Sequence, residues 1–335
     1  MLEVRTEESF PSGRLAASWE ALVASDPCAS LFHSARFLRL WCHHLCHWDL
    51  RLRFLQDSGE LVGVVPEVRE LTDEGRRVVH FAGGYHVTDY LGPVSRPEHR
   101  TDVVAAWFEE LEAEADWDEL IAAGLAEDAG WDQLIAERAR DGGSIVDGPV
   151  NEDVCPRINL SGGWEGYLGR LTSKQRHEIR RKARKLSREA GVVKLVAVDV
   201  DELPAAMDDF FTLNRAAGGE KGRFFVDESM YAFFHSLASE FGREGTLRIH
   251  CLDVEGEPAA ISVSLTHGEE WGLYNSAFDG ELRALAPGMV LLGELIRIAG
   301  EEGFGVFDLL RGGEPYKYRY GAENRGIRRL MVAPA

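Results

Sequence analysis

Apolar positions along the chain alternate between helical and strand-like spacing. In residues 32–45 the apolar side chains recur every three or four positions, which is typical of one face of a helix. The run 61–71 alternates around a proline and has the pattern of a hairpin. The first half is expected to hold helices at 15–24, 32–45 and 101–115, and strands at 50–56, 61–71, 76–83, 89–94 and 117–125.

The same order of elements returns in the second half of the chain. We expect helices at 207–214, 224–241 and 288–303, and strands at 246–256, 257–268, 269–278 and 305–310. The Trp117-Asp118 pair has a counterpart in Phe307-Asp308. Only two copies are present and each exceeds roughly 100 residues, so the pattern indicates a duplicated α+β unit and not a solenoid.

Composition narrows the classes of partner. The 335 residues include 37 basic and 56 acidic side chains, a formal charge of -19, which argues against DNA or an anionic membrane as the partner of the whole surface. No stretch has the length and apolar content of a membrane span or a secretory leader, so a cytoplasmic location is expected. The five cysteines are too few for a disulfide framework and are expected to be reduced thiols.

One segment reverses the overall charge. Residues 172–188 hold eight Lys or Arg and the single acid Glu178, a local charge of +7. The pattern predicts an amphipathic helix whose apolar side chains face inward, and these are Leu171, Ile179, Ala183 and Leu186. Two interpretations stay open: a solvated helix without a ligand, and a helix whose like charges, which destabilise it at this spacing, are compensated by a ligand that carries phosphate.

A second cluster combines cysteine and histidine. Residues 41–48 hold five side chains that could bind a metal, namely Cys42, His43, His44, Cys46 and His47. No second cluster with suitable spacing completes a zinc site, and packing is the simpler interpretation, so we expect no metal. Hydrolase elbows, phosphate-binding P-loops and dinucleotide fingerprints are absent from the sequence.

The densest candidate chemistry follows the apolar strand 305–310. Arg311 and two glycines come first, and Glu314, Tyr316, Lys317 and Tyr318 follow directly. Such a group of tyrosines, cations and a carboxylate is costly to bury without partners. Upstream of this strand, Pro287 and Gly288 stand at a predicted helix start, where free backbone N–H groups could bind a pyrophosphate.

Two motifs carry a resemblance to a known family. W-x-x-Y-L-x-x-L-x-x-K-x-R-x-x-I-R-R-K from Trp164 to Lys182, and F-D-x-L-R-G-x-E-P-Y-K-Y-R from Phe307 to Arg319, resemble the CelD-type acetyltransferases of the GNAT superfamily. This family is associated with cellulose and exopolysaccharide biosynthesis and is related to the FemAB-type aminoacyltransferases. The resemblance implies an α+β fold of tandem GNAT-like lobes with mixed sheets.

The resemblance also implies the organisation of the chain. We expect an N-terminal GNAT-like lobe over 1–155, a basic connecting segment over 156–190 and a C-terminal acyltransferase lobe over 191–335. The first lobe has no Tyr or Lys after its equivalent strand, so its expected role is structural or acceptor-binding. In GNAT domains two parallel strands splay, here 271–278 and 305–310, and the next helix start binds pyrophosphate. The family loop usually reads Q/R-x-x-G-x-G/A, whereas this chain has Arg283 to Gly288 with Ala286 at a glycine position.

The resemblance implies an N-acyltransferase that moves acetyl, or another acyl group, from coenzyme A to an amine of an amino sugar or related glycan precursor. The expected acid is Tyr316 or Tyr318, and Glu314 is the expected base. Four residues are assigned to the donor, Gly288, Met289, Arg311 and Lys317, and five to the acceptor, Lys174, Arg176, Arg180, Asn275 and Asp89. Two alternatives stay open: a FemAB-like transferase that uses aminoacyl-tRNA, and a non-catalytic module that binds a glycan or nucleotide.

Overall fold

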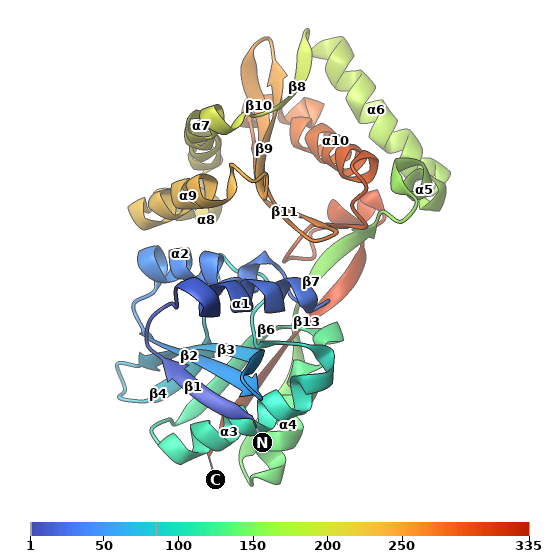
Figure 1. The fold of residues 1–335 in the computed structure, drawn as a ribbon. Helices are drawn as coiled ribbons and strands as arrows, with labels where there is room; N and C mark the ends of the chain where they lie inside the picture. The colour runs from blue at the N-terminus through green and yellow to red at the C-terminus, as the bar shows by residue number, and fades with distance from the viewer. Residues whose placement is uncertain (1, 85, 335) are drawn as a thin grey trace. The chain divides into compact units, whose positions relative to one another are not determined.

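The computed structural model describes residues 2–84 and 86–334. The chain divides into two compact units (Figure 1). Unit 1 comprises Met1–Val154 together with Arg325–Ala335, and unit 2 comprises Cys155–Asn324. The sequence analysis placed residues 325–335 in the C-terminal lobe, whereas they form part of unit 1.

Unit 1 is a mixed sheet with helices on its faces (Figure 1). Its strands are β1 (Glu3–Glu7), β2 (Asp49–Asp57), β3 (Glu60–Leu71), β4 (Arg77–Phe81), β5 (Val94–Ser95), β6 (Glu119–Ala126), β13 (Glu323–Ala333) and the first part of β7 (Ile145–Asn159). Its helices are α1 (Gly13–Ser25), α2 (Ala35–Leu45), α3 (Arg100–Glu114) and α4 (Trp131–Asp141).

The strands of unit 2 belong to the same hydrogen-bonded mixed sheet as those of unit 1, and β7 contributes its last residues to this part. The other strands are β8 (Val193–Ala197), β9 (Leu247–Val254), β10 (Glu257–His267), β11 (Glu270–Phe278) and β12 (Val306–Asp308). The helices are α5 (Gly163–Arg170), α6 (Ser173–Glu189), α7 (Leu203–Ala216), α8 (Gly219–Phe224), α9 (Glu228–Phe241) and α10 (Pro287–Glu301), with 3-10 turns η5 (Gly280–Leu285) and η6 (Lys317–Tyr320).

The two units share one strand order. In unit 1 the neighbours run β1-β2-β3-β4-β6, and in unit 2 they run β8-β9-β10-β11-β12. In both, the last of these pairs is parallel and the others are antiparallel. The predicted α+β fold with a duplicated unit is therefore confirmed.

Several details differ from the sequence expectation. Residues 61–71 form one strand and not a hairpin, and only Val94–Ser95 of the segment near 89–94 is a strand. The periodicity also left β1, α4, β7 and β13 unassigned. Asp118 does not correspond to Asp308, because Asp118 lies just before β6 whereas Asp308 is the last residue of β12. Asp308 forms the last pair of β11 with β12, and Ile121 forms the last pair of β4 with β6, so Ile121 is the counterpart of Asp308.

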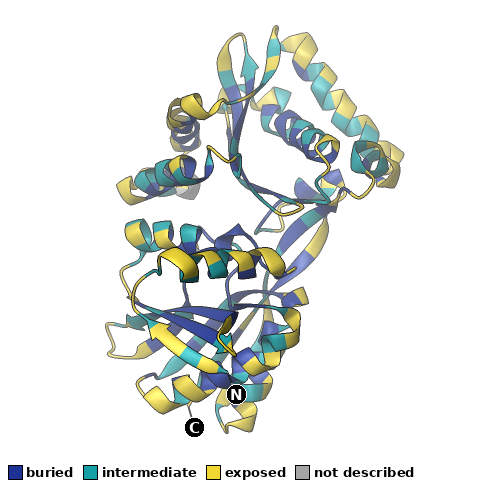
Figure 2. Cartoon of the chain, in the orientation of Figure 1, coloured by how far each residue is buried: buried dark blue, intermediate teal, exposed yellow. Residues whose placement is uncertain are grey.

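The core of unit 2 lies between its sheet and α10. Leu291, Leu295 and Ile296 of this helix are buried against Trp271 and Phe307 of the sheet. The outer helix α6 is mostly exposed or half-buried (Figure 2), and only Leu186 of its residues is fully buried. Ile179 and Ala183 pack against the same core, which confirms the predicted inward face of the basic helix.

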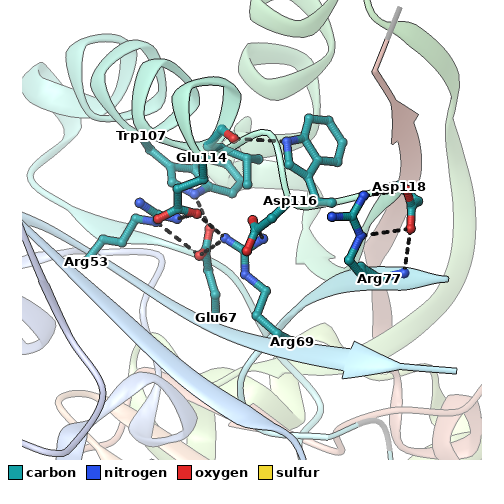
Figure 3. A network of polar contacts seen from close by, with 10 residues as sticks. Arg53, Glu67, Arg69, Arg77, Trp107, Glu114, Asp116 and Asp118 are labelled. Atoms are coloured by element: carbon teal, nitrogen blue, oxygen red, sulfur yellow. Dashed lines mark hydrogen bonds and ion pairs between the residues drawn. The ribbon is translucent and has the colours of Figure 1, made fainter. Parts of the chain in front are cut away.

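Unit 1 carries a buried ionic network on its sheet (Figure 3). The side chains of Arg53 and Glu67 are both fully buried and lie 3.0 Å apart. Glu114 accepts hydrogen bonds from Arg53 at 2.7 Å and from Arg69 at 2.8 Å, and Trp107 Nε1 donates to Glu67. Each buried charge therefore has a partner of opposite sign, as burial requires.

Candidate active site

The sheet of unit 2 opens between its two parallel strands. β11 pairs with β12 only at Glu270–Val306, Trp271–Phe307 and Gly272–Asp308. β12 ends there, while β11 continues to Phe278, and a bulge shifts its register with β10 between Val263 and Ser264. The predicted parting of these strands is thus present, and the backbone of β11 beyond Gly272 has no β12 partner.

A pocket of about 320 Å³ lies within unit 2 along this part of β11. Its wall is largely apolar and comes from β11 and α10. Three hydroxyl groups and three cations complete it. The lining residues are Lys182, Ser262, Leu273, Ser276, Phe278, Arg283, Ala286, Gly288, Met289, Leu291, Leu292, Leu295, Tyr316 and Arg319.

The loop between β11 and α10 keeps the shape that a glycine would give it. Ala286 has φ 55 and ψ 51, the left-handed conformation that glycine adopts most readily. Its carbonyl accepts the N–H groups of Met289 at 3.1 Å and Val290 at 3.2 Å. Pro287 has no N–H, so Gly288 is the residue of this first turn whose N–H has no hydrogen-bond partner among the described residues. Ala286 therefore holds a left-handed conformation that costs a residue other than glycine some backbone strain.

The cations of the pocket come from three separate segments. Lys182 lies on α6, Arg283 on η5 and Arg319 on η6. The side chains of Arg283 and Arg319 form no ion pair with another described residue, and no carboxylate among the described residues lines the pocket. Lys182 contacts Glu178 at 3.6 Å. The positive charge is thus available to an anionic ligand.

The segment after β12 is held by two buried ionic side chains. Asp308 Oδ1 accepts the N–H of Leu310 at 2.7 Å, which stabilises a turn where Leu310 has φ 55. Lys317 is 2 % exposed, and its Nζ donates to the carbonyls of Leu310, Arg311 and Gly312 at 2.9, 2.9 and 2.8 Å. The sequence analysis assigned Lys317 to the donor, whereas its three N–H groups are directed at the backbone. Lys317 is a positioning residue for this loop.

Tyr316 and Tyr318 lie in different surroundings. Tyr316 lines the pocket, and no other described residue hydrogen-bonds its hydroxyl. Burial raises the pKa of Tyr316 to about 12, and the charge of Glu314 adds to the effect, so the phenol stays protonated at neutral pH. Tyr318 instead donates to Asn324 Oδ1 at 2.8 Å and does not line the pocket. The Glu314 side chain is 53 % exposed and pairs with Lys317 at 3.0 Å.

The basic helix α6 lies beside the pocket, but through other residues than the sequence suggested. Lys182 lines the pocket, and Lys185 Nζ donates to the carbonyl of Ala284 at 2.8 Å. Arg176 donates to the carbonyls of Leu168 and Leu171 and so caps the end of α5. Lys174 and Arg180 are exposed and do not line the pocket.

The remaining predicted residues are divided among four places. Gly288 and Met289 line the pocket, as the donor assignment requires. Asn275 pairs with Val263 in register, on the strand positions that alternate with Ser276, so it lies on the opposite face of the sheet. Its Oδ1 is buried without a hydrogen-bond partner among the described residues. Arg311 is half-buried beyond β12 and does not line the pocket, and Asp89 belongs to unit 1.

Sequence reasoning left several lining residues unassigned. Ser262 and Ser276 face each other across β10 and β11, and alternation along two adjacent strands could have placed them on one face. Lys182, Arg283 and Arg319 were noted only within motifs. These three cations lie far apart in the sequence, and only the fold brings them to one pocket.

Comparison with known proteins agrees with this geometry. Residues 173–318 match the family model described as "Acetyltransferase (GNAT) domain". This part of the chain is a GNAT-type acyltransferase domain. The matched segment begins with α6 and ends in η6, and it contains every pocket-lining residue except Arg319. No curated protein matches this chain.

Solved structures show that the likeness extends over both units. A structure of FemX has 10% identity and a TM-score of 0.70, with 96% of each chain covered. The C-terminal domain of a putative lysylphosphatidylglycerol synthetase from Agrobacterium fabrum has 14% identity and a TM-score of 0.61, with 96% of this chain and 92% of that chain covered. A tandem GNAT protein from the clavulanic acid biosynthesis pathway has 14% identity and a TM-score of 0.52, with 100% and 98% covered. At these identities the likeness establishes the fold, which is a tandem GNAT fold.

Two features of the described residues concern metal ions and membranes. Within residues 2–84 and 86–334, three or more His, Cys, Asp or Glu side chains nowhere gather as they would around a metal ion. None of the described helices is both long enough and apolar enough to span a membrane.

Proposed function

We propose that this acyltransferase moves an acetyl group from acetyl-coenzyme A to the amine of an amino sugar or a related precursor in surface-polysaccharide biosynthesis. One observation carries the donor assignment: the pocket beside the parted strands has an apolar wall and three cations without a lining carboxylate. An amphipathic donor with a phosphate-rich end matches both properties. The resemblance to CelD-type proteins supports the choice of acceptor.

Different residues of the pocket would bind the charged and the neutral parts of this donor. Lys182, Arg283 and Arg319 would hold the phosphates, because each is a cation of the pocket lining. The N–H of Gly288, at the positive end of α10, would add a backbone donor. Leu291, Leu292 and Leu295 form the apolar wall on which the neutral part of the donor would lie.

The bound donor supplies a thioester. The amine nitrogen forms a bond to the acyl carbon, and the carbon–sulfur bond breaks to leave a thiolate. Tyr316 is the proposed acid, since its phenol is protonated at neutral pH and can give its proton to the thiolate. Glu314 is the proposed base, and it takes the proton that the amine loses, directly or through a water.

Coenzyme A binding and thiol release test the proposal. Titration calorimetry with acetyl-coenzyme A should show one site per chain. A thiol-release assay with a panel of amino-sugar nucleotides should show turnover that depends on the acceptor. Absence of both coenzyme A binding and thiol release with every acceptor would reject the proposal.

The FemAB-like alternative rests on a different feature. Helix α6 carries exposed cations outside the pocket, Lys174 and Arg180 among them, which could contact an aminoacyl-tRNA. This alternative predicts tRNA binding that weakens steeply as salt rises, because phosphate contacts release counterions. A gel-shift titration between 50 and 200 mM salt separates the two proposals, since tight, salt-sensitive tRNA binding with no affinity for coenzyme A favours the alternative.

The remaining alternative is a module that binds a glycan or nucleotide and does not catalyse acyl transfer. It predicts saturable binding of a glycan or nucleotide and no turnover with any acyl donor. The unpartnered hydroxyl of Tyr316 favours catalysis, because ligand binding alone needs no protonated phenol in an apolar wall.

A further inference from the structure

Unit 1 has a pocket of its own. It has a volume of about 520 Å³, within the range of small-molecule sites. It lies where β4 parts from β6, because the two strands pair only up to His80–Ile121. Phe81, Gly84 and Ala123, just beyond that pair, line the pocket.

One wall of the pocket is formed by the exposed Trp48, whose ring packs against His80. The rings of Trp48 and His80 stack 5.2 Å apart at an interplanar angle of 13°. His80 Nε2 lies 2.8 Å from Glu70 Oε2, which fixes the orientation of the imidazole. The Trp48 side chain is still 38 % exposed, so with one face against His80 its remaining ring surface is accessible. The indole ring is therefore held in a fixed orientation although it is not part of the hydrophobic core.

The cysteine and histidine segment of the sequence supplies this tryptophan. The thiol of Cys46 donates to the carbonyl oxygen of Trp48 at 3.5 Å and bridges the turn between α2 and β2. This hydrogen bond helps to hold the backbone of Trp48 at the end of the segment 41–48.

Polar groups of both kinds lie on the rest of the pocket wall. Glu152 Oε2 accepts the N–H of Gly124 at 2.8 Å, which fixes this acceptor group in position. Arg329 is exposed, and its side chain makes no hydrogen bond or ion pair with another described residue. Asn151 adds an amide. Hydrogen-bond donors and acceptors thus lie in the same pocket as an open aromatic ring.

We infer that this pocket binds a pyranose ring of a saccharide. One face of a pyranose carries apolar C–H groups that pack on an indole, while its hydroxyl groups both donate and accept hydrogen bonds. Nucleic acid would need a wall dominated by cations, whereas Arg329 shares this wall with Glu152. An apolar peptide would leave these charged groups unpaired. The lining residues of this pocket belong to unit 1, whereas the residues proposed for acyl transfer belong to unit 2.

Titration calorimetry of the full chain with cellotetraose, chitotetraose and tetragalacturonate tests this inference. At least one of these saccharides should bind saturably. Trp48→Ala should weaken that binding at least tenfold, and Arg329→Ala should weaken it by a smaller factor. Leu71→Ala is the matched control, since Leu71 is 72 % exposed on β3 and does not line the pocket. Tyr316→Phe should keep the saccharide affinity, so this result does not depend on the acyl-transfer proposal.

Three outcomes would overturn the inference. The first is no binding of any of the three saccharides at millimolar concentration. The second is saccharide binding that Trp48→Ala and Arg329→Ala both leave unchanged while the variants unfold at the wild-type temperature. The third is binding of uridine monophosphate at this pocket, lost in Trp48→Ala, with no saccharide bound.

Discussion

The ammonium of Lys317 lies 2.9 Å from the carbonyl oxygen of Leu310, and it also binds the next two carbonyls of the same loop. Lys317→Met keeps much of the volume but leaves these buried oxygens without a donor. We expect the free energy of unfolding to fall by about 2–4 kcal/mol, with loss of turnover because the loop that carries Tyr316 is no longer held. Urea unfolding measures the change, and Lys174→Met, at an exposed position, should be neutral. Unchanged stability of Lys317→Met would contradict this role.

Tyr316→Phe should lower kcat about 10²–10⁴-fold while KM for both substrates changes little, because the phenol proton is needed only as the thiolate leaves. Tyr318→Phe is the matched control and should keep kcat near the wild-type value. Since the pKa of Tyr316 is raised to about 12, we also expect no loss of wild-type kcat from this group up to pH 10. Full turnover by Tyr316→Phe would remove it from the mechanism.

Arg283→Ala and Arg319→Ala should each weaken coenzyme A binding at least tenfold, because a charge-assisted hydrogen bond contributes roughly 1.5–3 kcal/mol. The loss should shrink at high salt. Lys174→Ala and Arg180→Ala, which do not line the pocket, should keep affinity within about twofold of wild type. Calorimetry at two salt concentrations measures both sets. If the two sets weaken binding equally, the pocket is not the phosphate site.

His250 makes stability depend on pH. Burial, with a smaller effect from the charge of Arg248, lowers the pKa of this histidine to about 4. Between pH 6.5 and 4 the unfolded chain binds the proton and the folded chain does not, so stability is complete above pH 6.5 and falls as pH drops. The contribution lost by pH 4 is about 3 kcal/mol. Denaturant titrations at several pH values give the free energy of unfolding, which should fall with pH more steeply for wild type than for His250→Gln. The same pH dependence in both proteins would contradict the assignment.

Glu67→Gln tests the buried network of unit 1. The neutral amide removes the charge that faces Arg53, whose side chain is fully buried. We expect a loss of about 1–3 kcal/mol, because the charged hydrogen bond to Glu67 is weakened while Arg53 keeps Glu114 as its carboxylate partner. Glu60→Gln, in the exposed pair with Arg96, is the control and should change stability by less than about 1 kcal/mol. Thermal unfolding of both variants gives the comparison.

Much of the fold could be predicted because the spacing of apolar residues along the chain indicates which side chains are buried. The spacing of apolar residues predicted 207–214, 257–268 and 288–303, and each falls on a helix or strand of unit 2. The strands β7 and β13 were not predicted, since half-buried and polar residues alternate irregularly along β7 and its partners lie far away in sequence. Long-range pairing of this kind leaves little local signal.

The candidate site was predictable only in part. The segment after β12 was selected for its density of polar residues, and Tyr316 does line the pocket. The same density could not distinguish Lys317, which binds its own backbone, from Arg319, which lines the pocket. Both are cations in one short motif, and their roles depend on whether a carbonyl or a ligand occupies the space at the end of the side chain.

The return of β13 to unit 1 has a consequence for synthesis on the ribosome. Unit 2 is continuous from Cys155 to Asn324, so all of its residues are synthesised before Arg325. Unit 1 must wait for Arg325 and the residues after it, because β13 pairs with β6 in its sheet. The sheet of the N-terminal unit therefore gains its β13 strand only after every residue of unit 2 has been added to the chain.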